Sequence, residues 1–175
     1  MRTAEKIIAR PLFTHPGHGR NRTIAVISQA CKSSTMEHDA EQVASDWVIF
    51  ARYDANKAPD LVFANGWVLY DLVGENPHLA WDVIKRVISR YSERDYFSDS
   101  KTEAQKVVGN LAAGPLEDLL SAHGPVFIEA AEAEARSDRR MAWTLGGVWQ
   151  LGMSNEIWAR VQQAADHSYW SRPIK

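Results

Sequence analysis

The chain has 175 residues, of which 45% are hydrophobic and 24% charged, and this composition indicates one folded globular domain rather than a disordered chain. Its apolar runs fall short of the roughly 18–20 residues that span a bilayer, so we expect a soluble protein with no membrane partner. The single cysteine, Cys31, excludes an internal disulfide and a cysteine-rich zinc site. One thiol fits the reducing conditions of the cytoplasm, which is the location we expect.

The net charge of −2 is divided unevenly along the chain. Residues 1–35 hold six basic residues and one acidic residue, a net charge of +5, whereas residues 36–175 hold 14 basic and 21 acidic residues, a net charge of −7. We therefore expect a basic N-terminal extension that contains proline and glycine, residues 1–35, followed by a single helical domain, residues 36–175. The extension is either a loosely attached arm or the product of an upstream start codon, since Met36 begins a natural helix start.

From residue 34 onward the hydrophobic residues recur at three- and four-residue steps, which predicts a chain that is helical almost throughout. The predicted helices cover residues 34–55, 59–74, 76–92, 100–114, 115–124, 125–137, 138–149 and 154–170. Four of the starts carry side chains that bond the free N–H groups of a first turn: Ser34 with Glu37, Ser100 with Glu103, Asp138, and Ser154. Prolines at first turns and glycines at the ends mark the others: Pro77, Pro115, Gly74, Gly114 and Gly124.

Each of the first three helices carries an apolar stripe that we expect to be buried. The stripes are Val43, Trp47 and Phe50; Val62 or Phe63, Trp67, Tyr70 and Val73; and Trp81, Ile84, Val87, Ile88 and Tyr91. A weak internal repeat separates Asp71 from Asp118 by 47 residues, a period typical of two-helix repeats. We predict an all-α fold of seven to eight amphipathic helices in antiparallel hairpins, either HEAT-like or an irregular helical bundle.

The segment GNLAAGPLEDLLSAHGP, residues 109–125, is the least random part of the sequence. Its residues fit a helix that ends at Gly114, a second that begins at Pro115 with two carboxylates in its first turn, and a left-handed stop at Gly124. The alternative interpretation is a polar binding site made of Glu117, Asp118 and His123. The structural interpretation is the stronger one, because Glu117 and His123 are six residues apart, a poor match to one helix face.

The sequence contains no motif for a catalytic centre, a cofactor or a metal site. His15 and His18 are the only histidines close in sequence, and Cys31 has no activating base beside it. Arg139 and Arg140 have the pattern of an ordinary exposed pair. We therefore predict no catalytic residues, no metal and no cofactor.

The seven tryptophans indicate binding more than chemistry. Most of them should lie in the core, but a domain of this size does not bury seven indoles completely. Trp170 and one of Trp143 and Trp149 are the candidates for an exposed anchor. We place Trp149 beside Glu117, Asp118 and His123 as a candidate binding residue.

The pattern LAAGPLEDLL, then HG, then Ala135 and Asp138, then LGGVW resembles a family of small bacterial domains of unknown function, over roughly residues 40–160. The resemblance implies a bacterial cytoplasmic context and supplies no catalytic residues.

Together these features favour a protein–protein interaction module, with an immunity-type or regulatory partner as one version, whose binding partner is another protein. The alternative is a small-ligand-binding protein or an enzyme with a pocket near Glu117, Asp118, His123 and Trp149. Nucleic-acid binding through residues 1–35 is less favoured, because the body of the chain is acidic and the basic residues of the arm are not interleaved with aromatic ones. The oligomeric state is left open.

Overall fold

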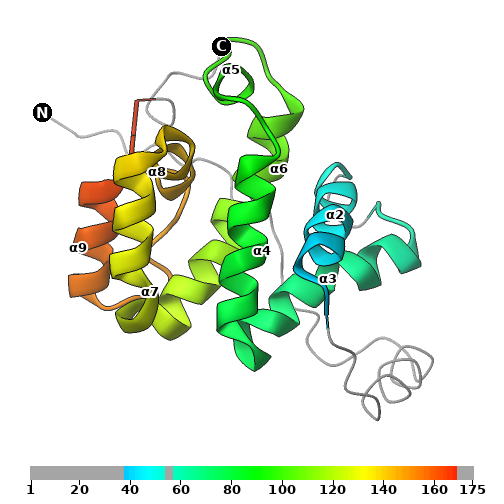
Figure 1. Ribbon diagram of the computed structural model, residues 1–175, viewed down its shortest axis with the longest axis horizontal. Helices are drawn as coiled ribbons and strands as arrows, with labels where there is room; N and C mark the ends of the chain where they lie inside the picture. Colours follow the sequence, from blue (N-terminus) through cyan, green and yellow to red (C-terminus); the bar gives the residue numbers. More distant parts are fainter. Residues whose placement is uncertain (1–37, 54–56, 169–175) are drawn as a thin grey trace, which may run out of the picture. The chain divides into compact units, whose positions relative to one another are not determined.

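The computed structural model describes residues 38–53 and 57–168, and it is helical with short connections (Figure 1). In chain order the elements are α2 (Ala40–Ala51), α3 (Asp60–Glu75), α4 (Pro77–Ser89), α5 (Glu93–Tyr96), α6 (Glu103–Leu111), η1 (Ala112–Leu116), α7 (Glu117–Ser137), α8 (Arg139–Leu145) and α9 (Asn155–Ala164). The described ranges contain no strand, and the predicted all-α fold class is confirmed. The HEAT-like arrangement stays a prediction, and the predictions for residues 1–35, for the Ser34–Glu37 cap and for Trp170 lie outside the described residues.

None of the helices in the described part of the chain combines the length and the apolar character that crossing a membrane requires.

The first three helices pack around aromatic and aliphatic side chains, with α2 in contact with both α3 and α4. Val43, Trp47 and Phe50 are buried as their spacing predicts, and Trp47 has no exposed surface. The prediction for α3 was wrong in part, because its buried residues are Gly66, Leu69, Leu72 and Val73. Phe63, Trp67 and Tyr70 are only half-buried and stack on one another along the helix, with ring centroids 5.2 Å and 4.5 Å apart.

Helix α4 lies at the centre of the packing, in contact with α2 and α3 as well as α6, η1, α7 and α8 (Figure 1). Its predicted stripe is buried, with Trp81 the most exposed member at 7%, apart from the half-buried Tyr91 beyond the end of the helix. Because α4 has neighbours on several sides, its amphipathic pattern positions the other helices around it.

Gly114 has non-helical backbone angles, φ −139° and ψ −105°, so one helix ends there and the next begins at Pro115, as the glycine and proline predicted. The two helices follow each other through η1 without a loop. Pro115 needs no N–H partner there, and Gly114 brings its backbone against α3. A Cβ atom on Gly114 would lie 2.4 Å from the hydroxyl oxygen of Tyr70, so the absence of a side chain at Gly114 permits this contact. Gly114 therefore lies at the break between two helices and also permits the tertiary contact with Tyr70.

The predicted break before Pro125 is present, one residue earlier than predicted, but its left-handed geometry at Gly124 is wrong. The non-helical residue within α7 is His123, with φ −129° and ψ 19°, and a helical segment that contains Pro125 follows it to Ser137. Among the described glycines the left-handed conformation occurs at Gly152. Gly124 instead packs against α9, where a Cβ atom would lie 2.8 Å from Ile157.

Most helix starts follow the local sequence. Pro77 occupies a first-turn position in α4, and Asp138 and Ser154 cap α8 and α9 as predicted. The cap predicted at Ser100 is wrong, because α6 is capped by Thr102 and Gln105. The Gln105 amide group also donates to the carbonyl oxygens of Tyr96 (3.0 Å) and Ser98 (2.9 Å), which sets the start of α6 two residues later.

The ends of α2 and α4 receive hydrogen bonds from distant side chains. Asn110 and Lys106, both on α6, donate to the carbonyl oxygens of Ala51 (3.2 Å) and Arg52 (2.7 Å) at the end of α2. At the end of α4 the Tyr96 hydroxyl donates to the Ile88 carbonyl over 3.0 Å. These bonds satisfy carbonyl groups that the last turn of a helix leaves free.

The contact between Gly114 and Tyr70 predicts the outcome of a double-mutant cycle. Gly114→Ala should lower the free energy of unfolding by about 1–3 kcal/mol, because the new methyl group overlaps the tyrosine hydroxyl. The same substitution in a Tyr70→Phe background should cost at least about 1 kcal/mol less, since the nearest remaining atom is the ring Cζ at 3.2 Å. Urea unfolding of the four proteins measures this coupling, and equal costs in both backgrounds would contradict it.

Candidate functional site

Glu117, the first residue of α7, is buried with 3% of its surface exposed. Its Oε2 atom accepts a hydrogen bond from the backbone N–H of Trp149, 3.2 Å away. A buried carboxylate is costly unless hydrogen bonds compensate the lost solvent, so this bond gives Glu117 a positioning role. The structure thus brings together two of the four predicted site residues, which are 32 positions apart in sequence.

Residues 146–153, here called the Trp149 loop, connect α8 to α9. The predicted helix over 138–149 ends at Leu145, and the loop leaves it through a tight turn in which Val148 N–H donates to the Leu145 carbonyl over 3.1 Å. The Ser121 hydroxyl of α7 donates to the Leu151 carbonyl, and Gly152 adopts the left-handed φ of 76°. Bonds from Glu117 and Ser121 therefore hold the loop backbone at two points.

The Trp149 loop is buried at residues 147–148 and at Met153, and exposed at the residues between them. Val148 and Met153 are buried at 5% and 7% exposure, whereas Trp149 and Leu151 are exposed at 39% and 52%. The prediction that one of Trp143 and Trp149 is exposed is confirmed, since Trp143 has no exposed surface. Two buried side chains anchor a short segment that presents two apolar side chains to solvent.

The Tyr70 hydroxyl lies near the start of α7, against Gly114, and sequence reasoning assigned it to the core only. It is buried and has no hydrogen-bond partner within the described ranges. Burial raises the pKa of Tyr70, and the charges of Asp118 and Glu117 raise it further. The hydroxyl therefore stays protonated at neutral pH.

The described hydrogen bond of His123 joins it to α3. A carbonyl oxygen only accepts, so His123 carries its proton on Nε2 and donates it to the Val73 carbonyl, 2.9 Å away in the last turn of α3. The bond ties the kink of α7 to the end of α3. His123 thus bonds a carbonyl group in the last turn of α3, as Asn110 and Lys106 bond carbonyl groups at the end of α2.

A groove of about 300 Å³ lies elsewhere, between α4, α7 and α8. Its lining combines a buried apolar floor with charged side chains of both signs: Asp82, Lys85, Arg86, Ile88, Ser89, Glu134, Asp138 and Met141. None of the four predicted site residues is among them. Most of its charges are already paired, Lys85 with Asp82 at 3.4 Å and Arg86 with Glu41 at 3.3 Å.

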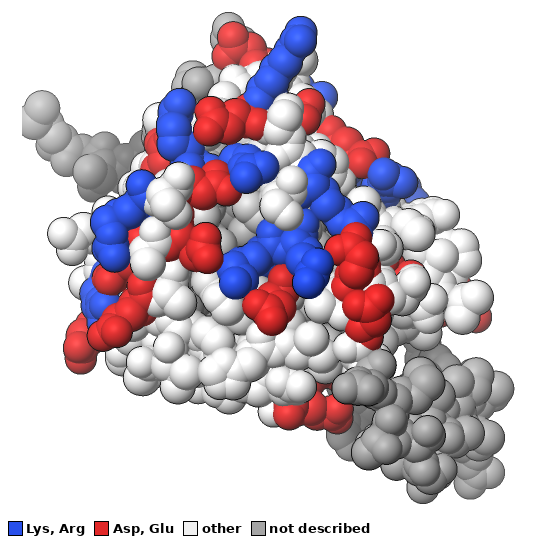
Figure 2. Space-filling view, in the orientation of Figure 1, with Lys and Arg blue, Asp and Glu red and all other residues white. Residues whose placement is uncertain are grey.

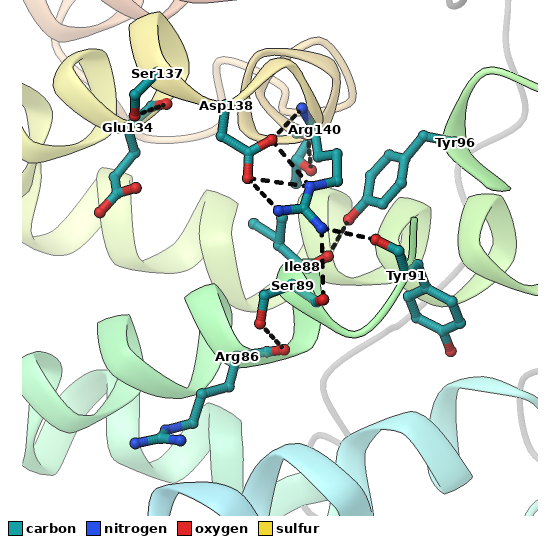
Figure 3. A network of polar contacts seen from close by, with 10 residues as sticks. Arg86, Ile88, Ser89, Tyr91, Tyr96, Glu134, Ser137, Asp138 and Arg140 are labelled. Carbon is teal, nitrogen blue, oxygen red and sulfur yellow. Dashed lines mark hydrogen bonds and ion pairs between the residues drawn. The ribbon is translucent and has the colours of Figure 1, made fainter. Parts of the chain in front are cut away.

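Arg140 pairs with Asp138, which lines this groove, and its interpretation as part of an exposed pair was wrong (Figure 3). Its guanidinium group makes a forked contact with Asp138, including an Nη2–Oδ2 distance of 2.7 Å, and donates to the Tyr91 carbonyl over 2.8 Å. Those hydrogen bonds hold the pKa of Asp138 below its usual value near 3.8. The pair stabilises the end of α4 rather than forming a site for a ligand.

Charges of both signs are also mixed on the face of the molecule shown in Figure 2, where Lys and Arg side chains alternate with Asp and Glu side chains. Within the described residues no group of three or more His, Cys, Asp and Glu side chains could hold a metal ion. The Trp149 loop is the candidate site, because it exposes two large apolar side chains while Glu117 and Ser121 of α7 hold its backbone.

Comparison with known proteins finds one match. Residues 51–169, more than half of the chain, match the model of a family of unknown function (DUF6869). No curated protein and no solved structure matches the chain. The predicted resemblance to a family of unknown function is confirmed to this extent.

Removing the carboxylate of Glu117 should loosen the Trp149 loop. In Glu117→Ala the Trp149 N–H loses its acceptor, and we expect its amide hydrogen exchange to accelerate and the unfolding free energy to fall by about 1–3 kcal/mol. Hydrogen exchange followed by NMR measures this locally, with the exposed Glu129→Ala on the same helix as control. Unchanged exchange at Trp149 in the Glu117 variant would contradict the positioning role.

Asp138→Asn should reveal the ion pair with Arg140 through its pH dependence. The variant keeps a side-chain oxygen to cap α8 but loses the charge, and we expect it to be less stable by about 1–3 kcal/mol at neutral pH. Because the folded-state pKa of Asp138 is lowered, the contribution is present above the ordinary value near 3.8 and is lost as the pH falls through the folded value.

Urea unfolding of both proteins at stepped acidic pH should show their difference in stability shrinking below about pH 4. Asp82→Asn, which breaks an exposed pair with Lys85, should change stability little at any pH. A gap between wild type and Asp138→Asn that persists unchanged into acid would refute the assignment.

Proposed function

The chain belongs to this family of unknown function, which brings no activity with it, and we propose that it acts by binding another protein through the Trp149 loop. The observation that carries the proposal is the presentation of Trp149 and Leu151 by a loop whose backbone is bonded to α7 at two points. Exposed aromatic side chains in a fixed setting are the residues that dominate the energy of protein interfaces.

Preorganisation is the first support for this function. A loop that must become ordered on binding loses conformational entropy, and this loss reduces affinity. The bonds from Glu117 and Ser121, together with buried Val148 and Met153, order the Trp149 loop before any partner arrives. Such a loop needs no further ordering to present its two apolar side chains.

The bonding of the candidate residues is the second support. Glu117 and His123 are each engaged with a backbone group, and neither lines the groove between α4, α7 and α8. Catalysis or small-ligand binding would require such groups to face a common space. A binding protein requires only that Glu117 hold the loop and that His123 hold α7 against α3. A regulatory or immunity-type partner, whose task is to bind one other protein, fits this use.

Site-specific photo-crosslinking in cells of the source organism tests the proposal. A photoreactive amino acid at Leu151 should capture a defined protein, and adding Trp149→Ala should abolish the capture, because the anchor is lost. Leu61, which is 73% exposed on α3, provides the matched control. The same photoreactive amino acid at position 61 should not capture that protein, and Leu61→Ala should leave capture from position 151 intact.

Two results would overturn the proposal: no captured protein from position 151, or a captured protein that persists in the Trp149→Ala variant. Circular dichroism and thermal unfolding of each variant verify that the fold is retained.

A further inference from the structure

We infer that the groove between α4, α7 and α8 is a second binding site, which takes a short dipolar molecule with an ammonium group at one end and a carboxylate at the other, such as a small peptide with free ends. None of the residues that line the groove belongs to the Trp149 loop, so the site is separate from the proposed protein-binding surface. The inference goes beyond the proposed function and does not depend on it. It comes from the way in which the charges along the groove are paired.

The groove offers space and an apolar surface to a small molecule. Its volume of about 300 Å³ lies at the lower end of the range for small-molecule sites. Ile88 and Met141 form its floor and are each 2% exposed. Charged side chains stand on both sides of this floor, Arg86 on α4 and Glu134 on α7, and no contact joins these two in Figure 3. Such a lining suits a ligand with an aliphatic middle and charged ends.

Toward α7, two carboxylates share one ammonium group. The Nζ atom of Lys85 lies 3.4 Å from Asp82 and 4.0 Å from Glu134. A charge-assisted hydrogen bond is about 2.7–2.9 Å long, so the contact with Glu134 is an ion pair without a hydrogen bond. Two carboxylates and one ammonium group leave this cluster with a net charge of −1. Because Lys85 lies closer to Asp82, the surplus negative charge belongs to Glu134.

Toward α2, the pairing is reversed, and two guanidinium groups share one carboxylate. Glu41 pairs with Arg90 and also with Arg86, whose Nη1 atom is 3.3 Å from Oε2 of Glu41. Arg90 is held more firmly, since it also donates to the Ser45 hydroxyl over 2.8 Å. Two guanidinium groups and one carboxylate leave a net charge of +1. The surplus positive charge therefore belongs to Arg86, which lines the groove.

The third charged pair at the groove is balanced, because Asp138 is matched by Arg140. The groove thus presents one under-paired anion, Glu134, and one under-paired cation, Arg86, on different helices. A ligand that carries one sign of charge would be attracted by one of them and repelled by the other. A dipolar ligand satisfies both, with its ammonium group at Glu134, its carboxylate at Arg86 and its aliphatic part on the floor.

Isothermal titration calorimetry of the full chain with di-, tri- and tetrapeptides of alanine and leucine tests the inference. At least one peptide with free ends should bind. Acetylation of its amino end, or amidation of its carboxyl end, should each weaken binding by about two- to fivefold, the range expected for the loss of one partly exposed ion pair. Added salt should weaken the binding of the free peptide as well.

Variants of the two residues assign each end of the ligand. In Glu134→Gln, acetylation should no longer weaken binding while amidation still does, and in Arg86→Gln the reverse should hold. The matched controls are Arg94→Gln and Glu129→Gln, which remove the same charges at exposed positions outside the groove and should leave all affinities unchanged. Circular dichroism verifies that each variant keeps its fold.

Three results would overturn the inference: no peptide of the series binds, the blocked peptides bind as tightly as the free ones, or only one of the two blocks weakens binding to the wild-type chain. The last result would indicate a site for a single charge. None of these results bears on photo-crosslinking from Leu151, so the inference and the proposed function fail separately.

Discussion

Hydrogen bonds from later helices to the carbonyl ends of earlier ones are the interaction on which this structure depends. Asn110 and Lys106 bond the end of α2, His123 bonds the last turn of α3, and Arg140 bonds the segment that follows α4. In each case the donor approaches from another helix, so the bond that satisfies the helix end also sets the distance between two elements. The same hydrogen bonds therefore end a helix and fix its packing against another helix.

The position of the Trp149 loop depends on how α7 is held against α3. The contact of Gly114 with Tyr70 places the start of α7 against α3, and the His123 bond holds the next turns of α7 in the same place. Glu117 and Ser121 lie between these two contacts and reach the loop from there. Glu117 and Ser121, in the segment 109–125, therefore position the exposed Trp149 through bonds to the loop backbone.

This division explains what the sequence could predict. Starts capped by Asp138 and Ser154 were recognised because the capping bonds join residues two or three positions apart. The breaks at Gly114 and beside Gly124 were also recognised, but the left-handed conformation assigned to Gly124 was wrong. The second role of both glycines was not predictable from local sequence, because they accommodate the side chains of Tyr70 and Ile157 from other helices. For α6, two capping pairs competed within three residues, and only the tertiary bonds of Gln105 decide in favour of Thr102.

Two residues of the candidate site, Glu117 and Trp149, were predicted, but their roles were not. Trp149 was recognisable as one of two residues on different helix faces, and Glu117 as a carboxylate in a notable segment. Their bond was not predictable, because it joins positions 32 residues apart and depends on where α8 ends. Tyr70 gave no signal beyond its place in an apolar stripe, since its unusual setting arises from a backbone contact with Gly114.

The sequence separation of the end-capping bonds has a consequence for synthesis on the ribosome. The donors for the ends of α2, α3 and α4 follow their acceptors by 59, 54, 50 and 49 residues. At a translation rate of about 5–20 residues per second, each of these helices waits several seconds for its partner to emerge. The nascent chain therefore passes through an interval in which the carbonyl groups at the ends of α2 and α3 are bonded to water and not yet to their donors from α6 and α7.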